Sequence, residues 1–298
     1  MRKLLAFAAC GALALGASAC GDDDNSGGGG GGSDLSGTIK IDGSSTVGPF
    51  AQAAAEQFQG ENPDVRISVG TSGTGGGFEK FCAGETDISD ASRPIKPDEE
   101  APICKKKGIA YKEVQVANDG ISVVTNKSIS VKCLTTDQLK EIWNKGSKDK
   151  KYSLYGPGTD SGTFDFFTEQ INGEEGVSRK DYQPSEDDNV LVRGVEGDDK
   201  GLGYFGFSYY EQNQDRLNLV AVNGGSGCVK PSTEAIQGGE YKPLSRPLFM
   251  YPSEKALERP EVKAFMDYVV ENYDKIAEAS QIVPMSSEQA NKAKTELG

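Results

Sequence analysis

Hydrophobic and polar positions alternate along several short segments of the chain. Such alternation is typical of half-buried β-strands, because successive side chains of a strand point to opposite faces. The clearest cases are 37–42, 65–69 and 217–222, which read G-T-I-K-I-D, V-R-I-S-V and L-N-L-V-A-V. We predict further strands at 87–92, 109–116, 120–125 and 247–251. Two short apolar pieces, 191–192 and 203–207, are left unassigned.

Apolar positions recur at helical spacing in other segments, most clearly in 260–273. Trp143 is the only tryptophan, and we expect it to pack in the core from one of these helices. Strands and helices alternate along the chain, which predicts an α/β fold with a mainly parallel sheet. The predicted helices are 50–58, 78–82, 136–143, 164–171 and 260–273.

Three loops rich in glycine, serine and threonine precede predicted helices, at 43–48, 70–77 and 156–163. A helix N-terminus presents unpaired N–H groups and the positive end of the helix dipole, so it suits an anion. In open α/β sheets, ligands bind beyond the carboxyl ends of the strands. The three loops therefore predict a site for a small, compact anion.

Nucleotide binding is the rival interpretation of these loops. A dinucleotide fingerprint needs G-x-G-x-x-G in a first βα turn and an acidic residue about 20 positions later. Residues 73–77 read G-T-G-G-G and depart from this pattern. A phosphate loop of the Walker type must end in Gly-Lys-Ser/Thr, and none of the three loops does.

The full sequence has a formal net charge of −13 and contains no histidine. Such a charge argues against nucleic acid as a partner. Without histidine, Ser-His-Asp and Cys-His catalysis and histidine-ligated metals are excluded. An exported phosphatase would depend on carboxylates such as Asp187-Asp188 or Asp198-Asp199, which we interpret as solvated loop charges. We expect no enzymatic activity, no metal and no cofactor.

Residues 1–20 resemble a bacterial lipoprotein signal peptide, with a charged start, an apolar stretch and a cysteine after small residues. Cys20 would then be acylated and become the mature N-terminus. The usual leucine three residues before the cysteine is Ala17 here, so cleavage near Ala19 without lipidation is the alternative. Residues 21–36, rich in glycine and aspartate, are expected to form a flexible tether.

Six cysteines occur in the full sequence. Cys10 belongs to the signal and Cys20 to the lipid anchor. An even number then remains in an exported protein, so two disulfides are expected, with three pairings open. The remaining cysteines are Cys82, Cys104, Cys133 and Cys228.

Taken together, these motifs resemble the phosphate-binding proteins of the PstS family, which serve high-affinity phosphate ABC transporters. The matching pieces are G-S-S-T at 43–46, T-S-G-T-G-G-G at 71–77, D-I-S-D-A-S-R-P at 87–94 and G-T-D-S-G-T at 158–163. Their order matches over roughly residues 37–285.

The resemblance implies a periplasmic-binding-protein type II fold, in which two α/β lobes are joined by a two-strand hinge and close on ligand. We place the crossings near 116–120 and 245–249. Lobe one then comprises 37–117 plus 248–298, and lobe two comprises 118–247. On this layout we favour the disulfides Cys82–Cys104 and Cys133–Cys228, since each then lies within one lobe.

The resemblance also implies a phosphate site. Val47 would contribute its backbone N–H. Arg93 is the candidate cation, because its planar fork suits an edge of phosphate; the alternative is a surface salt bridge. The implied phosphate-binding residues are Ser45, Thr46, Val47, Ser72, Gly73, Thr74, Ser92, Arg93, Asp160, Ser161, Gly162 and Thr163.

Two positions depart from the family pattern. Pro157 falls near the place where relatives carry an arginine, and Ser92 falls where they carry an aspartate. A carboxylate in the cleft would accept the proton of phosphate and repel sulfate. Asp42, Asp90 and Asp160 are candidates for this role, and the sequence leaves the choice open.

We therefore predict a monomeric phosphate receptor, anchored by lipid at Cys20 on the extracytoplasmic face of the cell membrane, that delivers phosphate to a membrane-embedded ABC permease. The alternative is a binder of another tetrahedral oxyanion, such as sulfate or arsenate. An exported phosphatase is the remaining alternative.

Overall fold

The computed structural model describes residues 35–298. The predicted signal peptide with Cys20, and the predicted tether up to residue 34, lie outside the described residues. Within residues 35–298, no helix has the length and hydropathy required to cross a membrane. Residues 35–298 belong to one compact unit.

The described strands form one continuous sheet, in the order β2-β1-β3-β10-β4-β8-β6-β7, with β5 and β9 joined to it at β4. Every pairing that involves β4 or β10 is antiparallel, and every other pairing is parallel. The expected parallel sheet is thus present on both sides of two antiparallel strands. These two are β4 (Val114–Thr125) and β10 (Ser245–Pro252).

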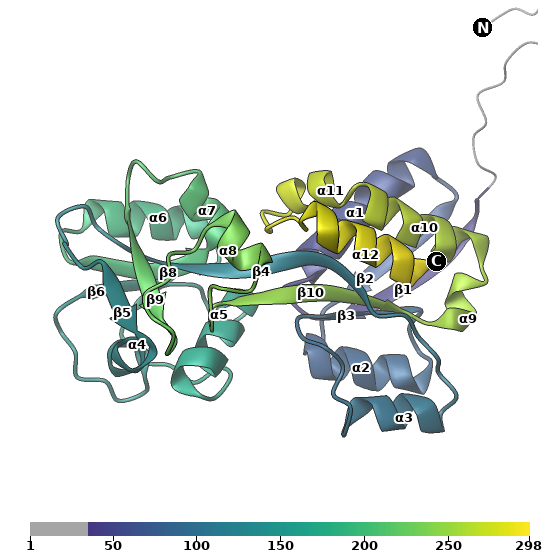
Figure 1. Cartoon of the computed structure of the whole chain (residues 1–298), viewed down its shortest axis with the longest axis horizontal. Coiled ribbons are helices and arrows are strands. Elements are labelled where there is room, and N and C mark those ends of the chain that lie inside the picture. Colours follow the sequence, from purple (N-terminus) through teal and green to yellow (C-terminus); the bar gives the residue numbers. More distant parts are fainter. Residues whose placement is uncertain (1–34) are drawn as a thin grey trace, which may run out of the picture. The chain divides into compact units, whose positions relative to one another are not determined.

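Lobe one is built around the sheet β2-β1-β3. One face is covered by α1, α10, α11 and α12, and the other by α2 and α3 (Figure 1). Its strands are β1 (Gly37–Gly43), β2 (Val65–Gly70) and β3 (Ile88–Ala91). Its helices are α1 (Gly48–Glu61), α2 (Gly73–Ala83), α3 (Glu100–Lys106), α9 (Glu254–Leu257), α10 (Pro260–Glu271), α11 (Tyr273–Ala279) and α12 (Ser287–Leu297).

Lobe two has its own apolar core, in which Trp143 is fully buried against Phe167 and Tyr204, as expected. Its strands are β5 (Cys133–Thr135), β6 (Ser153–Gly156), β7 (Gln183–Pro184), β8 (Gly201–Gly206) and β9 (Asn218–Asn223). Its helices are α4 (Thr136–Trp143), α5 (Gly162–Phe167) with the π-turn Thr168–Asn172, α6 (Asp188–Gly197), α7 (Phe207–Glu211) and α8 (Thr233–Gln237).

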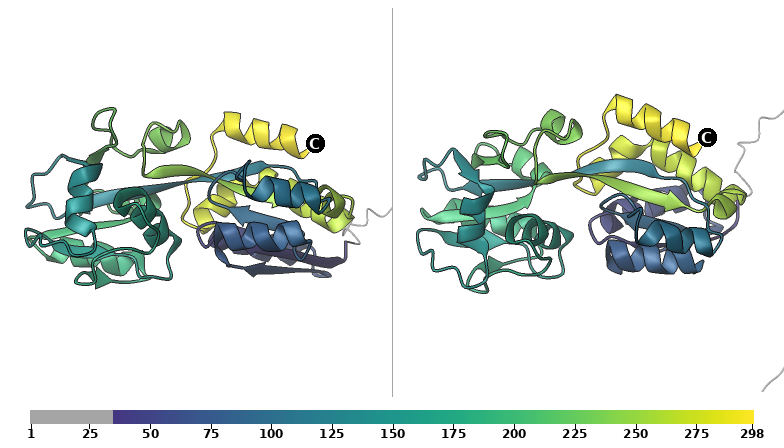
Figure 2. Two further views of the ribbon diagram at one scale, coloured as in Figure 1. Left: turned by 90° about the horizontal axis from the view of Figure 1, so that it is seen from below. Right: turned by 60° about the horizontal axis from the view of Figure 1, so that its bottom comes forward.

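Strands β4 and β10 run side by side from one lobe to the other (Figures 1 and 2). In β4, Ala117 packs in the core of lobe one and Ile121 in the core of lobe two. In β10, Leu248 belongs to the core of lobe one, whereas Leu244, just before the strand, belongs to that of lobe two. Both segments therefore contribute to the cores of both lobes.

The sequence predicted two strands separated by residues 117–119, and this is wrong. Strand β4 is continuous, because Ala117, Asn118 and Asp119 all pair with β10. The polar side chains Asn118 and Asp119 are buried but hydrogen-bonded, so they do not end the strand. The irregularity lies instead in β10, at Leu248/Phe249.

Other boundaries also differ from the sequence pattern. Helix α2 begins at Gly73, inside the predicted loop. A Cβ on Gly77 would lie 2.5 Å from Gly43 Cα, so glycine allows this helix to approach β1 closely. Residues 191–192, left unassigned, belong to α6, which Asp187 caps by accepting from Asn189 N.

The structure contains the disulfides Cys82–Cys104 and Cys133–Cys228, which is the favoured pairing. The first joins α2 to α3 in lobe one. The second encloses most of lobe two.

Candidate anion-binding site

A cavity of about 490 Å³ lies between the two lobes, at the crossing strands. Lobe one supplies the loop after β1, the start of α2 and the loop after β3. Lobe two supplies the start of α5 and the π-helical turn behind it, and the start of β10 completes the lining with Ser245 and Arg246. The predicted residues that line the cavity are Ser45, Thr46, Ser72, Gly73, Thr74, Ser92, Arg93 and Gly162.

The loop after β1 is held in place by Ser44. Its hydroxyl accepts from the backbone N–H groups of Thr46 at 3.2 Å and Val47 at 3.4 Å. Its own N–H donates to the carbonyl of Asp90 in β3. This turn presents Thr46 to the cavity, whereas Val47 is fully buried beneath it.

The loop after β2 is held by Asp42 at the end of β1. Its carboxylate accepts from both the N–H and the hydroxyl of Ser72, and Lys80 pairs with it at 2.7 Å. Burial acts to raise the pKa of Asp42, but the bonds from Lys80 and Ser72 outweigh it and lower the pKa. Asp42 therefore fixes the start of α2, so that Gly73 and Thr74 face the cavity.

The loop after β3 joins the second loop through hydroxyl groups. Thr74 Oγ1 accepts from Ser92 N at 3.2 Å, and the two hydroxyl oxygens lie 3.1 Å apart. Ser92 is 9% exposed. The hydroxyls of Thr74 and Ser92, from two loops of lobe one, thus form one hydrogen-bonded pair at the cavity.

Arg246, on strand β10, places its guanidinium at the meeting point of these loops. It donates from Nη1 to Ser92 Oγ at 3.0 Å and from Nη2 to Thr46 Oγ1 at 2.8 Å. Nη2 also donates to the carbonyl oxygen of Gly162, in lobe two, at 3.3 Å. One cation thus contacts both lobes at the floor of the cavity.

Two neighbours fix the plane of that guanidinium. Asp119, its partner across the two crossing strands, accepts from Nε at 3.1 Å. The ring of Phe166 lies beneath, with its centroid 3.8 Å from Arg246 Cζ. Burial lowers the pKa of Arg246 from its usual value, although Asp119 acts in the opposite direction. An arginine remains charged under these conditions.

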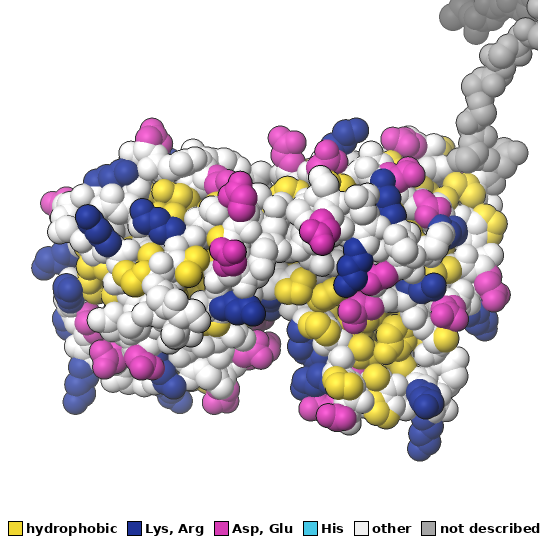
Figure 3. All heavy atoms as spheres, viewed as in Figure 1, with side chains coloured by type: hydrophobic (Ala, Val, Ile, Leu, Met, Phe, Trp, Pro, Cys, Tyr) yellow, Lys and Arg dark blue, Asp and Glu magenta, His cyan; other side chains and the backbone are white. Residues whose placement is uncertain are grey.

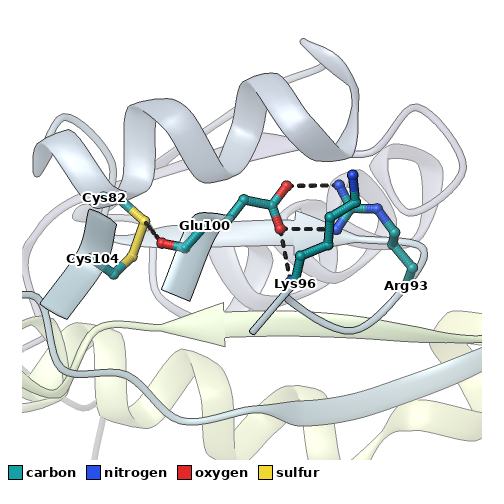
Figure 4. The surroundings of a disulfide bond; sticks show 5 residues. All are labelled: Cys82, Arg93, Lys96, Glu100 and Cys104. Carbon is teal, nitrogen blue, oxygen red and sulfur yellow. Dashed lines mark hydrogen bonds and ion pairs between the residues drawn. A yellow bond between two sulfur atoms is a disulfide. The ribbon is translucent and has the colours of Figure 1, made fainter. Parts of the chain in front are cut away.

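Arg93, the cation predicted from the sequence, lines the cavity but is engaged elsewhere. Its two Nη atoms donate to the two carboxylate oxygens of Glu100, at 2.9 and 2.7 Å (Figure 4). These bonds raise the pKa of Arg93. Glu100 lies on α3, beside the Cys82–Cys104 disulfide. The salt-bridge alternative for Arg93 is therefore realised in this structure.

At Gly162, lobe two lies directly against lobe one. A Cβ on this residue would lie 2.8 Å from both Ser45 Oγ and Thr46 N, and closer still to Thr46 Oγ1. Only glycine fits without displacing the neighbouring atoms. The lobes are therefore in contact at the edge of the cavity.

Four of the predicted residues do not line the cavity: Val47, Asp160, Ser161 and Thr163. Ser161 caps α5 by accepting from Thr163 N at 3.2 Å. Asp160 is exposed, and its N–H donates to Glu186 at 3.4 Å.

Among the candidate carboxylates, Asp42 is engaged with Ser72 and Lys80, and Asp90 is completely buried behind the first loop. The carboxylates that do line the cavity are Asp165, Glu169 and Glu175. Burial and then repulsion from Glu175 raise the pKa of Asp165 to about 6.

Arg246 and Asp165 line the cavity but are not among the residues predicted from the sequence. Arg246 is 200 residues from Thr46 in the chain and follows no glycine-rich loop. The available signal was its place in the predicted crossing 245–249, where a charged side chain has to find a polar partner. Asp165 lies four residues after Ser161, within the predicted helix.

The fold and the cavity define a two-lobed binding protein that encloses a small ligand at its hinge. Residues 29–272 match the family described as PBP superfamily domain. A crystal structure described as a possible phosphate binding protein from Planctomyces limnophilus is 43% identical, with a TM-score of 0.84. That match covers 89% of this chain and 98% of the other.

Two curated relatives match as closely. Protein SphX of Synechococcus elongatus is 44% identical over 83% of this chain and 77% of its own length. The phosphate-binding protein PstS of Staphylococcus saprophyticus is 41% identical over 88% of this chain and 84% of its own length. The chain belongs to the PstS family of phosphate-binding proteins.

Proposed function

We propose that this protein captures inorganic phosphate in the cavity between its lobes and delivers it to an ABC permease. The observation that carries the proposal is the convergence at Arg246. A largely buried guanidinium, 14% exposed, donates to hydroxyls from two loops of lobe one, Thr46 and Ser92, and to the backbone of lobe two at Gly162. An anion there receives charge-assisted hydrogen bonds in a site of low dielectric.

Thr46, Thr74 and Ser92 are the hydroxyl donors in this proposal, and the start of α2 supplies backbone N–H groups. Arg246 supplies the positive charge, and Arg93 acts at longer range from its pair with Glu100. Closure at Gly162 excludes water. The protein binds and releases its ligand and does no chemistry on it.

We further propose that the chain is a monomer, held on the extracytoplasmic face of the cell membrane by a lipid at Cys20. The charged start, the apolar stretch, the small residues before Cys20 and the glycine-rich stretch after it support this location. On the face shown in Figure 3, acidic and basic side chains are interspersed. This arrangement and the net charge of −13 both argue against nucleic acid as a partner.

Calorimetric titration of residues 34–298 tests the proposal, after the protein has been stripped of carried-over ligand. We expect one-to-one binding of phosphate at neutral pH and much weaker binding of sulfate. Tighter binding of sulfate would favour the other-oxyanion alternative. Absence of binding to either anion would contradict the proposed function.

A further inference from the structure

The hydrogen bonds of Arg246 determine how the hydroxyls around the cavity are oriented. A guanidinium carries five N–H donors and no acceptor. Thr46 Oγ1 and Ser92 Oγ lie 2.8 and 3.0 Å from its nitrogens, so both oxygens must accept. A hydroxyl whose oxygen accepts retains its own hydrogen for another partner. Thr46 therefore has one O–H to donate, and it lines the cavity.

Ser92 and Thr74 together are also left with one hydrogen to donate. Their oxygens are 3.1 Å apart, so one hydroxyl donates to the other. If Ser92 donates, Thr74 Oγ1 accepts from both Ser92 Oγ and Ser92 N, and the Thr74 hydrogen is free. If Thr74 donates, Ser92 Oγ accepts from Thr74 and Arg246, and the Ser92 hydrogen is free. Either way, one O–H remains for a ligand in the cavity.

The guanidinium can impose this pattern because its own orientation is fixed. Asp119 holds Nε, the Gly162 carbonyl accepts from Nη2, and the Phe166 ring lies under Cζ. A lysine ammonium at this position could not reach Asp119, Ser92 and Thr46 in one plane, because it is a single donor centre.

We propose that Arg246 is a positioning residue that turns the hydroxyls of Thr46 and of the Ser92–Thr74 pair into donors. The cavity then selects a tetrahedral anion whose oxygens at these two places carry no proton. This inference rests on the proposed function and deepens it. It states that part of the effect of Arg246 on binding passes through Thr46 and Ser92, in addition to the effect of its charge.

A double-mutant cycle distinguishes the two effects. Thr46→Val is measured in the wild-type background and in Arg246→Lys, with the Kd for inorganic phosphate from calorimetry at pH 7. Loss of a charge-assisted bond raises Kd by about tenfold or more. We expect such a loss for Thr46→Val in wild type but less than about threefold in Arg246→Lys, where the hydroxyl is free to rotate. Thr46→Ser keeps the hydroxyl and is expected to bind nearly as wild type.

Arg216→Lys is the matched control, because Arg216 pairs with Glu196 at the surface of lobe two. It should leave Kd unchanged. If Arg246→Lys fails to fold in thermal unfolding, Asp119→Ala replaces it, since it keeps the guanidinium charge and removes the acceptor of Nε. Equal effects of Thr46→Val in both backgrounds would overturn the inference, and so would wild-type affinity in Arg246→Lys. Failure of the proposed function is distinguishable, because the wild type itself would then not bind phosphate.

Discussion

Gly162→Ala tests whether contact between the lobes is part of binding. The added Cβ would lie 2.8 Å from Ser45 Oγ and Thr46 N, where ordinary contact begins at 3.4 Å. The lobes must therefore separate by about 0.6 Å or more at this point. Both contacted residues belong to lobe one, so the clash opposes closure and leaves the core of lobe two intact.

The expected cost follows from this geometry. Overpacking at a tight contact costs about 1–3 kcal/mol, which corresponds to an increase of about 5- to 150-fold in Kd. The upper part of the range applies, because the same separation strains the bonds of Arg246 to Thr46 and to the Gly162 carbonyl. Gly197→Ala is the control, because Gly197 lies in the same lobe and a Cβ there would meet nothing within 4 Å.

Calorimetry with phosphate measures the affinity, and small-angle X-ray scattering with and without phosphate measures closure. We expect Gly162→Ala to bind weakly and to remain more open in saturating phosphate, while its melting temperature stays close to that of wild type. Binding equal to that of Gly197→Ala would refute the argument that this contact forms in the bound state.

Three further predictions concern two aspartates and the disulfides. Asp165 has a pKa raised to about 6, so its carboxylate ionises above that pH and repels an anion. Sulfate binding by wild type should weaken as the pH rises through 6, and Asp165→Asn should remove this slope; equal slopes in calorimetric titrations would contradict it. Burial raises the pKa of Asp90 well above its usual value, and neither carboxylate oxygen has a partner among residues 35–298. The folded state thus holds this proton more tightly than the unfolded chain, and stability is lost as the pH rises above about 4. The gain in melting temperature from Asp90→Asn should therefore grow between pH 4 and 7, and a constant gain would be evidence against this. Loop entropy gives about 5 kcal/mol for the Cys133–Cys228 disulfide, with 95 residues of separation, and about 3 kcal/mol for Cys82–Cys104, with 22. Urea unfolding should therefore show a larger loss of unfolding free energy when Cys133 and Cys228 are both replaced by alanine than when Cys82 and Cys104 are. The reverse order would contradict the loop-entropy estimate.

Local sequence signals predicted the loops of lobe one well. Ser45, Thr46, Ser72, Gly73, Thr74 and Ser92 all line one cavity, because each follows a strand whose carboxyl end points to the same edge of the sheet. Glycine and hydroxyl residues mark such turns directly in the sequence.

The cation could not be found in this way. Arg246 reaches the cavity through the pairing of β10 with β4, which joins positions more than 120 residues apart. The pairing is a property of the whole fold and leaves no local pattern. Arg93 was the natural candidate beside a loop, but Glu100 on α3, seven residues later, holds both of its Nη atoms.

The predicted break at 117–119 failed for a related reason. Asn118 and Asp119 look like turn residues in the sequence, yet their partners are Pro284, Gln289 and Arg246, far along the chain. Because these hydrogen bonds pair their buried side chains, Asn118 and Asp119 remain part of strand β4 between the two lobes.

The order of the two disulfides along the chain bears on how the protein matures. Within residues 35–298, each cysteine pairs with the next cysteine along the chain, Cys82 with Cys104 and Cys133 with Cys228. A chain exported from its N-terminus exposes Cys82 and Cys104 to an oxidant first, and they can be joined before Cys133 emerges. Cys133 can form its native bond only after Cys228 has emerged. Nearly all of lobe two has been translocated at that point. For a chain exported as proposed above, with Cys20 held by its lipid, oxidation in order of emergence joins the same pairs that the structure contains.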